Sequence, residues 1–527
     1  MTEIACDSDA TGAAVSRAWV SGRRARVLLC GAGASFLIML DTNVVAISLP
    51  SIARDLHVGF TSVEWVVSAY ILAFAALLMP AGALADRLGR RRMLICGLAT
   101  FSTGSLLCGL SSGIEMLMAA RVLQGVGAAF QLSAALAVLG HEFRGHERAR
   151  AFAFWGSLSG LAVVIGPVVG GGVATFIGWR WVFLVNEVPV GAALIVLALT
   201  SVRESRDPHA RRLDLPGIVL FGTGLFSMVW ALIGANHAGW GSISTLAKLA
   251  VGVALLVVFI VAERAQRRPM VDLSLFRRST VVGAAVAMLG FAASAQVMLT
   301  FLPLCLQDMF GASPMLAGLE MVPFAVLMFL CPRLAGILAT RLSGRALLGI
   351  GLGVVAAGDG LIAAAIQSGQ AYWIVAVGMA ITGSGAGLLN GETTKVQISV
   401  VPTDRAGMAS GITGTTRFVG LVSGVAGLGA VLAAAATQNL KALAQPWTAG
   451  RFYDWHHLIL KLVGGDAGAA LSMIPADLRE RMADAMQASM SLGFAITFVA
   501  AALVAIICGI LTFLLIRAAE TAPTQPK

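Results

Sequence analysis

The sequence GALADRLGRRRML, residues Gly82–Leu94, lies between two long apolar runs, 63–83 and 93–112. Each run is long enough to cross a bilayer as a helix, which takes about 20 mainly apolar residues. The stretch itself holds four arginines beside Asp86, and basic residues collect in loops on the cytoplasmic side of a membrane. It therefore predicts two membrane-spanning helices joined by a short cytoplasmic loop.

The composition of the whole chain also indicates a membrane protein. Of 527 residues, 58% are hydrophobic and only 12% are charged, whereas soluble domains carry about 25% charged residues. The formal net charge of +10 indicates basic cytoplasmic loops rather than a nucleic-acid partner, because the sequence has no long basic tract with interleaved aromatic residues. The seven cysteines form no CxxC pair and no Cys/His cluster with zinc spacing, so we expect no metal site.

The chain contains fourteen apolar runs of spanning length, which predicts an all-α polytopic membrane protein with fourteen transmembrane helices. The first run is too long for the core of a signal peptide and has no clear cleavage site, so we interpret it as the first span. The approximate limits of the runs are 28–49, 63–83, 93–112, 115–139, 151–173, 181–201, 215–234, 246–263, 281–304, 315–338, 346–366, 372–396, 407–434 and 491–516.

The distribution of basic residues orients these spans. If the N-terminus is cytoplasmic, the inner loops hold strings such as RRAR (Arg23–Arg26) and RGHERAR (Arg144–Arg150). The short outer loops then offer only Arg54, Arg180 and Lys248. This asymmetry predicts that both termini lie in the cytoplasm.

A second copy of the opening stretch occurs later in the chain. GILATRLSGRALL (Gly336–Leu348) repeats the pattern Gly-x-Leu-Ala-x-Arg-Leu, with Thr340 in the place of Asp86. Such a repeat indicates two related six-helix halves; the alternative is a coincidence among short Gly/Leu/Arg strings. The predicted organisation is a cytoplasmic tail (1–27), a six-helix bundle (28–201), cytoplasmic linkers with two inserted helices (202–280), a second six-helix bundle (281–516) and another cytoplasmic tail (517–527).

One predicted outer loop is long and belongs to the second bundle. It covers 435–490 and contains the string PADLRERMADAMQ, which has helical spacing and mixed charge. This string is either an amphipathic helix on the membrane surface or a structured cap, and we favour the cap.

Seven motifs, in the right order and on the right spans, resemble those of the major facilitator superfamily. The resemblance is closer to its fourteen-span drug:proton antiporter branch, the EmrB/QacA type. One motif is the opening stretch, which is similar to the loop between spans 2 and 3. The others are LDTNVVAISLP (Leu40–Pro50), SVEWVVSAYILAFA (Ser62–Ala75), RVLQGVGAA (Arg121–Ala129), GLAVVIGPVVGGG (Gly160–Gly172), WRWVFLVNEVPVG (Trp179–Gly191) and RAGMASG…TTRFVG (Arg405–Gly420).

The resemblance implies a major facilitator fold of two six-helix bundles plus two inserted helices, and it implies roles for two motifs. In the opening stretch, a charge network around Asp86 would hold a cytoplasmic gate shut; the alternative, a simple topology anchor, explains the arginines but not Asp86. The span 5 motif is associated with antiporters, and its proline and small residues would bend the helix and smooth one face; the alternative is ordinary packing of small residues. The gate residues are Gly82, Asp86, Arg87, Gly89, Arg90 and Arg91, and the antiporter motif is Gly166, Pro167, Gly170 and Gly171.

Asp41 and Arg121 are two charges inside predicted spans. An ionised side chain at the centre of a bilayer costs about 2.5–3.5 kcal/mol on insertion scales, so such charges pair or face water. At 1.5 Å per residue, both residues lie roughly 10–13 Å below the outer surface. We expect them to meet if spans 1 and 4 line the central cavity, as the family fold implies, with Gln124 one turn away. The pair is then either a proton-coupling site or a static contact that fixes helix packing.

Further polar residues lie in the spans of the second half. Glu392 and Lys395 are three residues apart near the inner end of span 12, where a local ion pair competes with a role in the cavity, as it does for the neighbouring Asn390. Arg417, near mid-depth in span 13, should contact backbone carbonyls or a polar partner in its own half. Asp359 in span 11 departs from the family pattern and either faces the cavity or is a buried acid.

These observations predict a secondary active exporter of drug-like or metabolite molecules in a bacterial inner membrane, working by proton antiport. An importer or symporter on the same fold and a non-transporting membrane sensor are the alternatives. The sequence has no nucleophile elbow, HExxH motif or Walker loop, so we expect neither an enzyme nor a cofactor, and the proton gradient would supply the energy. The expected partners are the substrate, protons and the lipid bilayer; we expect a monomer, with an adaptor and outer-membrane channel as an open question.

Overall fold

The computed structural model describes most of the chain. The described residues are 22–58, 60–199, 204–205, 214–266, 269–312, 314–369, 371–401, 406–446, 454–455, 458–459, 462 and 467–521. They form helices and turns and contain no strand. Residues 1–21 of the predicted tail 1–27 and much of the segment around 202–213 therefore lie outside the described residues, whereas residues 22–27 are helical.

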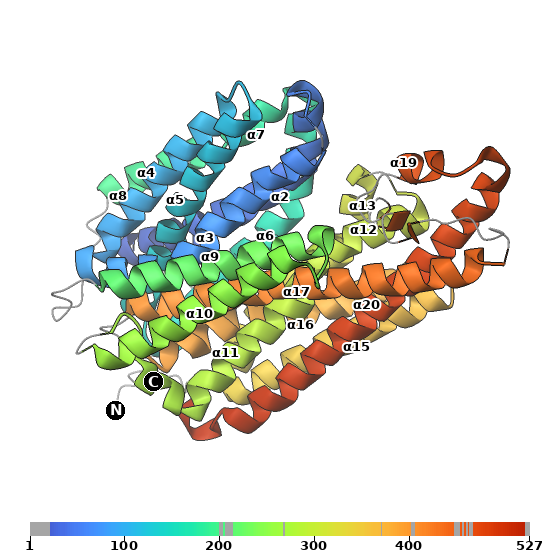
Figure 1. The fold of residues 1–527 in the computed structure, drawn as a ribbon. Helices are drawn as coiled ribbons and strands as arrows, with labels where there is room; N and C mark the ends of the chain where they lie inside the picture. The colour runs from blue at the N-terminus through green and yellow to red at the C-terminus, as the bar shows by residue number, and fades with distance from the viewer. Residues whose placement is uncertain are drawn as a thin grey trace, which may run out of the picture.

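The N-terminal half is a bundle whose long helices alternate in direction (Figure 1). The break between its last two helices comes at Val185 and Asn186, near the start of the predicted sixth span. Its helices are α2 (Gly22–Asp55), α3 (Phe60–Leu88), α4 (Arg90–Gly109), α5 (Ile114–Glu142), α6 (Gly145–Phe176), α7 (Trp179–Leu184) and α8 (Glu187–Leu199).

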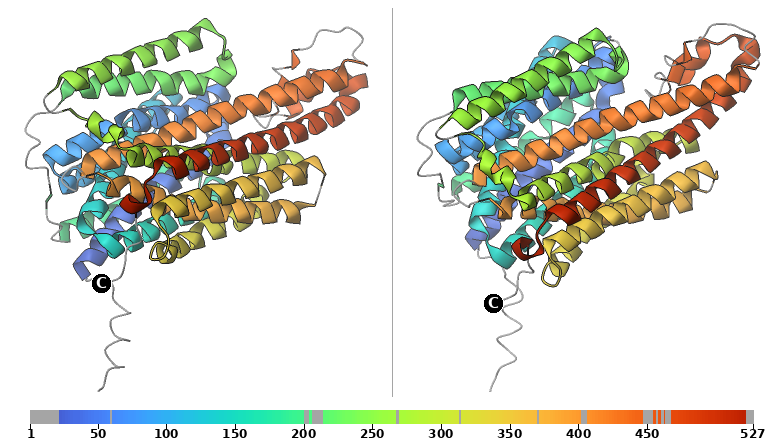
Figure 2. Two further views of the ribbon diagram at one scale, coloured as in Figure 1. Left: turned by 90° about the horizontal axis from the view of Figure 1, so that it is seen from below. Right: turned by 60° about the horizontal axis from the view of Figure 1, so that its bottom comes forward.

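The inserted pair consists of α9 (Leu215–Ala238) and α10 (Ile243–Ala265), and a 3₁₀ turn, η1 (Leu273–Arg277), follows it. Asp214 begins α9 by accepting a hydrogen bond from the backbone N–H of Gly217 at 2.9 Å, which is the contact expected of an N-cap. Ser242 caps α10 in the same way. In Figure 2 the pair, drawn in green, runs along the outside of the bundle.

The C-terminal half is the second bundle. Its first spanning segment is interrupted by a π-helical turn, η2, and its second is divided at Met321. Its elements are α11 (Ser279–Phe291), η2 (Ala292–Gln296), α12 (Met298–Phe310), α13 (Pro314–Glu320), α14 (Val322–Leu338), α15 (Gly344–Gln367), α16 (Tyr372–Ser399), α17 (Ala406–Ala444), α19 (Ala467–Ser472), η4 (Ala476–Leu478), α20 (Arg479–Leu515) and η5 (Ala518–Thr521).

Twelve helices of the described part are long and apolar enough to cross a membrane. This finding supports an all-helical polytopic protein but does not confirm the predicted count of fourteen. The two expected spans that are missing from the twelve are 151–173, which falls within α6, and 315–338, which is divided between α13 and the 17-residue α14.

The long outer loop predicted at 435–490 is shorter in the structure. Helix α17 has 39 residues and α20 has 37, so each is about 55–58 Å long, well above the roughly 30 Å of a hydrocarbon core. Both helices extend past their neighbours in Figure 2. The string PADLRERMADAMQ is not a separate helix, because most of it forms the first turns of α20. The sequence misplaced these boundaries because only the apolar part of each helix was counted as a span.

The first helix begins and the last spanning helix ends on one face of the molecule, on the left in Figure 2, which we call the terminal face. The buried apolar side chains of the C-terminal half form one cluster. Those of the N-terminal half form two clusters, and the larger one also takes in Met408, Ile412 and Phe418 of α17. The two halves therefore share a core where α17 leaves the terminal face.

Candidate functional site

Asp41 lies on α2 at the centre of a buried polar cluster. Its Oδ2 accepts a hydrogen bond from Arg121 Nη1 at 2.7 Å. Its Oδ1 accepts from Gln124 Nε2 at 3.0 Å and from Asn186 Nδ2 at 2.8 Å. Asp41 is 1% exposed and Arg121 is fully buried, so the interaction is a desolvated ion pair. Such a pair is stable only when other hydrogen bonds satisfy its polar atoms. Gln124 and Asn186 do this for the Asp41 carboxylate, whereas Arg121 Nη2 is buried without a hydrogen-bond partner.

Arg121 is held from several directions. Its Nε donates to the carbonyl oxygen of Val66 at 3.1 Å, and its Nη1 also donates to Gln124 Oε1 at 2.6 Å. Its guanidinium carbon lies 4.2 Å from the centre of the Tyr70 ring, within the range of a cation–π interaction. The arginine is therefore a fixed positive charge that links α5 to α3 and faces Asp41 on α2.

Ser105 and Asn186 complete the group that we call the Asp41 cluster: Asp41, Ser105, Arg121, Gln124 and Asn186. The hydroxyl of Ser105 accepts from Gln124 and Asn186 at 3.3 and 3.2 Å and donates to the carbonyl of Phe183 at 2.9 Å. Sequence reasoning missed both residues. An asparagine inside an apolar span was an available signal for Asn186, but its direction depends on the helix break between α7 and α8.

The antiporter motif lies directly against the Asp41 segment of α2. A Cβ atom on Gly166 would lie 2.7 Å from Asn43 Cβ, and one on Gly170 would lie 2.8 Å from Val44 Cα. Both distances are shorter than side chains tolerate, so α6 and α2 meet only because these residues are glycines. Pro167 and Gly171 also belong to α6, but their surroundings fall outside the described residues.

Replacing Gly170 by valine should destabilise the protein, because the new side chain would overlap Val44. Overpacking of this kind costs about 1–3 kcal/mol, which should appear as a lower melting temperature of the detergent-purified protein. Gly172→Val is the matched control, since no atom lies within 4 Å of the position its Cβ would take on the same helix. Equal melting temperatures for the two variants would contradict the close packing.

Asp86 joins the two halves at the terminal face. Its Oδ1 accepts from the backbone N–H of Gly407 at 2.7 Å, and its Oδ2 accepts from that of Met408 at 2.8 Å. Arg90 donates to the same carboxylate from Nη2 at 2.8 Å. Gly407 and Met408 are in the first turn of α17, where free N–H groups and the helix dipole favour an anion. Asp86 thus caps a helix of the opposite half.

The backbones of the two halves also touch beside Asp86. A Cβ atom on Gly82 would clash with the carbonyl oxygen of Gly407. One helical turn further in, the hydroxyl of Ser410 donates to the carbonyl of Ser133 at 2.7 Å. We call this contact, made by Gly82, Asp86, Ser133, Gly407, Met408 and Ser410, the terminal-face closure.

The described contacts of the remaining gate residues are made within the N-terminal half and with the segment that directly follows it. Gly89 has a φ of +110°, a conformation that favours glycine, and lets the chain turn from α3 into α4. The backbone N–H of Arg91 donates to Glu204, and its guanidinium donates to the carbonyl of Leu197. Arg87 is half-buried and is not among the described partners of Asp86.

The second copy of the repeat does not form an equivalent contact. The hydroxyl of Thr340, which stands in the place of Asp86, lies just after α14 and donates to the carbonyl of Ile337 in the last turn of that helix at 2.8 Å. A threonine cannot offer a charged acceptor to the other half. The terminal-face closure is therefore asymmetric between the two halves.

The polar residues predicted in the C-terminal half do not form one site. Asn390 donates to the carbonyl of Gly156 in the N-terminal half at 3.0 Å. Glu392 and Lys395 form the local ion pair that was one of the two expectations. Asp359 is fully buried and accepts from Thr382 Oγ1 at 2.9 Å, so it faces α16 inside its own bundle.

Arg417 has the kind of partner that the sequence suggested. Its Nε donates to Gln296 Oε1 on the π-helical turn η2 at 2.9 Å, and the residue is 5% exposed. The guanidinium carbon lies 5.6 Å from the Trp155 ring of the N-terminal half and 5.7 Å from the Phe291 ring of its own half. Arg417 therefore sits between the halves.

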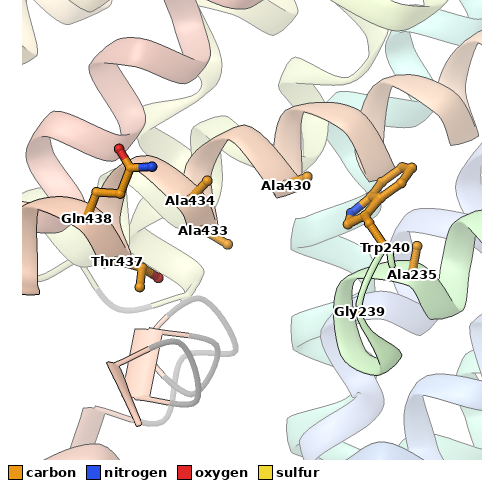
Figure 3. Close-up of a pocket in the computed structure, with 8 residues that line it drawn as sticks. All are labelled: Ala235, Gly239, Trp240, Ala430, Ala433, Ala434, Thr437 and Gln438. Atoms are coloured by element: carbon orange, nitrogen blue, oxygen red, sulfur yellow. The ribbon is translucent and has the colours of Figure 1, made fainter. Parts of the chain in front are cut away.

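A cavity of about 370 Å³ lies apart from the Asp41 cluster, between the inserted pair and α17. It is lined by Ala235, Gly239 and Trp240 at the end of α9 and by α17 residues between Ala430 and Gln438 (Figure 3). The lining is mostly apolar. No member of the Asp41 cluster lines this cavity, so the cavity is not in contact with the buried ion pair of Asp41 and Arg121.

Two helical bundles that share a closure at one face, with an ion pair buried inside one bundle, define a two-domain class of membrane transporter. The family model described as Major Facilitator Superfamily matches residues 31–425. The chain belongs to this superfamily, and it is a multi-pass membrane transporter of small molecules rather than an enzyme.

Curated relatives match about three quarters of the chain. It is 37% identical over 405 residues to multidrug resistance protein Stp of Mycobacterium tuberculosis, covering 76% of this chain and 74% of the relative. It is 33% identical over 421 residues to the tetracenomycin C resistance and export protein of Streptomyces glaucescens, covering 78% and 77%. It is 35% identical over 425 residues to the drug efflux pump JefA of M. tuberculosis, covering 78% and 81%. The relatives are thus named as bacterial resistance and export proteins.

Solved structures show the same fold at low identity. The human organic anion transporter MFSD10 superposes with a TM-score of 0.60 at 14% identity, covering 94% of this chain and all of that one. The proton:xylose symporter XylE superposes with a TM-score of 0.59 at 12% identity, covering 95% and 97%. Because these chains transport different substrates, the fold alone does not identify a substrate or a direction of transport.

Proposed function

We propose that this protein exports drug-like or metabolite molecules from a bacterial cell in exchange for protons, by alternating access across the inner membrane. The observation that carries the proposal is the Asp41 cluster, in which a buried carboxylate is paired with a buried arginine. An acid inside the membrane region is costly and is a functional-site candidate by default. The names of the relatives, which are resistance and export proteins, support transport out of the cell.

The proton step we propose takes place at Asp41. Arg121, Gln124 and Asn186 all donate hydrogen bonds to this carboxylate. A proton on Asp41 would remove its attraction to Arg121 and leave the arginine without a counter-charge. Because that state is unfavourable in a buried site, protonation would drive a rearrangement of α2 and α5.

A chain of aromatic contacts offers a route from this rearrangement to the other half. Arg121 lies on the ring of Tyr70, whose centre is 5.7 Å from that of Phe74. Phe74 in turn meets Phe418 of α17 edge-on, with ring centres 4.3 Å apart. Phe418 belongs to the helix that Asp86 caps, so the Asp41 cluster and the terminal-face closure share a continuous packed path.

The topology we propose has fourteen spans with both termini in the cytoplasm. In this scheme two further spans complete the twelve helices of spanning character. One is α6, and the other is formed by α13 together with α14. The terminal face is then cytoplasmic, and the structure represents a state that is closed toward the cytoplasm. The protein acts as a monomer without a cofactor and is driven by the proton gradient; whether an adaptor and outer-membrane channel assist it is a separate question.

The experiment that tests this proposal uses the wild-type protein reconstituted in liposomes that contain a pH-sensitive dye. Adding a transported compound to one side should move protons in the opposite direction to the compound. Proton movement in the same direction would instead support the symporter alternative. Binding of compounds without any flux would support the sensor and contradict a transport function.

A further inference from the structure

Arg417 is a buried cation with no acidic partner among the described residues. Its described hydrogen bond runs to the neutral side chain of Gln296, and its terminal nitrogens are not among the polar atoms that are sealed from solvent. Arg121, the other arginine deep in a bundle, has the carboxylate of Asp41 at 2.7 Å. The contrast indicates that no carboxylate of the described residues balances the charge of Arg417.

A guanidinium group has five N–H donors, and burying such a charge unpaired is expensive. One bond to an amide leaves most of these donors free. Arginine forms strong bidentate contacts with carboxylates and similar planar anions. A ligand that carries an anionic group would therefore supply the missing counter-charge.

The surroundings of Arg417 indicate the shape of that ligand. Trp155 and Phe291 present aromatic rings within 6 Å of the guanidinium from opposite halves. The indole Nε1 of Trp155 is buried without a hydrogen-bond acceptor. Asn390, which bonds the carbonyl of the next residue, Gly156, has a buried Oδ1 without a donor. Two buried aromatic rings, one cation and two unused polar atoms thus lie where the halves meet.

We propose that Arg417 binds the negatively charged group of the transported molecule, and that the preferred substrates are aromatic organic anions such as carboxylates or ionised phenols. The rings of Trp155 and Phe291 pack against the aromatic body of the substrate. Since Arg417 and Trp155 belong to different halves, the substrate contacts both halves. It would be released when the two halves move apart. This assignment rests on the proposed transport function, which it extends to a substrate class.

The experiment compares two probes that share one ring system, 2-naphthoate and 2-naphthamide, at neutral pH. Their affinities for the detergent-purified protein are measured by calorimetry, without a pH gradient. The wild type should bind the naphthoate about tenfold or more tightly than the amide, since hydrogen bonds to charged groups are the strong ones. Arg417→Gln should remove this preference and leave the affinity for the amide within about twofold.

Matched variants separate a binding role from a structural one. Arg333→Gln removes another arginine that lies near an aromatic ring, 4.9 Å from Phe329, and should not change either affinity. Trp155→Phe keeps the aromatic surface but removes the N–H group, and it should weaken both probes to the same degree. If Arg417→Gln does not fold, Arg417→Lys provides the test. This variant should still prefer naphthoate to naphthamide, but it should bind naphthoate several-fold more weakly than the wild type does.

The assignment would be overturned if the wild type bound both probes equally or bound neither. It would also be overturned if Arg417→Gln kept the preference for naphthoate, or if Arg417→Lys left both affinities unchanged. The binding measurement does not depend on proton coupling. Failure of the proton-flux experiment with intact naphthoate selectivity would therefore contradict the antiport mechanism and leave the anion site standing. The reverse combination would contradict the anion site alone.

Discussion

Replacing Asp41 by asparagine is expected to reduce substrate accumulation in a pH gradient to the level of passive exchange. A gradient of about 2 pH units supplies about 2.7 kcal/mol per exchanged proton, which sustains a concentration ratio of about 100. The variant cannot bind and release the proton, so the ratio should fall to about 1 whatever the gradient. The measurement is uptake of a transported compound into inside-out vesicles, with and without a collapsed pH gradient.

The same substitution should leave downhill exchange measurable. Asparagine has nearly the volume of aspartate, but it offers one acceptor oxygen where Arg121, Gln124 and Asn186 now donate to two. Breaking a buried ion pair costs about 3–5 kcal/mol, so the variant should also melt at a lower temperature. Asp41→Glu keeps a titratable group and should recover part of the coupling. Full gradient-driven accumulation by Asp41→Asn would show that the Asp41 cluster is a static packing contact.

Asp55 on the same helix provides the control. The indole N–H of Trp179 and the guanidinium of Arg180 donate to its carboxylate at 3.0 and 2.7 Å, and these contacts lower the pKa of Asp55 below its ordinary value. A carboxyl whose pKa is lowered in the folded state stays ionised until the pH falls below that value. Asp55 therefore has no reason to change protonation near neutral pH, and Asp55→Asn should retain gradient-driven accumulation.

The sequence was most informative where a polar residue lay inside an apolar run. Depth along the spans placed Asp41 and Arg121 at one level, and the structure joins them directly. The same reasoning could not find Ser105 or Asn186. A serine in a helix is too common to stand out, and the orientation of Asn186 depends on a break that apolar periodicity does not reveal.

The contacts between the halves were the hardest to anticipate. The sequence placed Asp86 among arginines and so suggested a network of charges, but two of its acceptor contacts go to backbone N–H groups of α17. Those groups become available only because a helix of the other half begins there. Likewise, the lengths of α17 and α20 follow from helical turns beyond the membrane, which carry polar residues and have no apolar signature.

Gly82→Val is expected to hold the transporter open at the terminal face. A side chain at this position would overlap the carbonyl oxygen of Gly407, and the Cα of Gly411 lies only 3.1 Å from the same point. Both obstacles are backbone, which cannot move aside without separating α3 from α17. A shift of about 5.5 kcal/mol is enough to turn a two-state population from 99:1 to 1:99, so a steric block should make the closed state undetectable and reduce transport by at least about tenfold.

The population change can be followed with a cysteine at Ala409, which is 1% exposed within the closure, in a background whose native cysteines are replaced. A maleimide applied to the terminal face should label Ala409→Cys slowly in the parent and at least about tenfold faster in the Gly82→Val variant, because labelling of the open form follows its population. Gly33→Val is the matched control, since no atom lies within 4 Å of its Cβ position on α2.

Asp86→Asn removes the charge without adding bulk and should give an intermediate rate, since each lost hydrogen bond to a charged group weakens the closed state by about 1.5–3 kcal/mol. Identical labelling rates in the parent, Gly82→Val and Asp86→Asn would mean that the contact between α3 and α17 does not control opening, and the role of Asp86 would then be limited to the folding of its own loop.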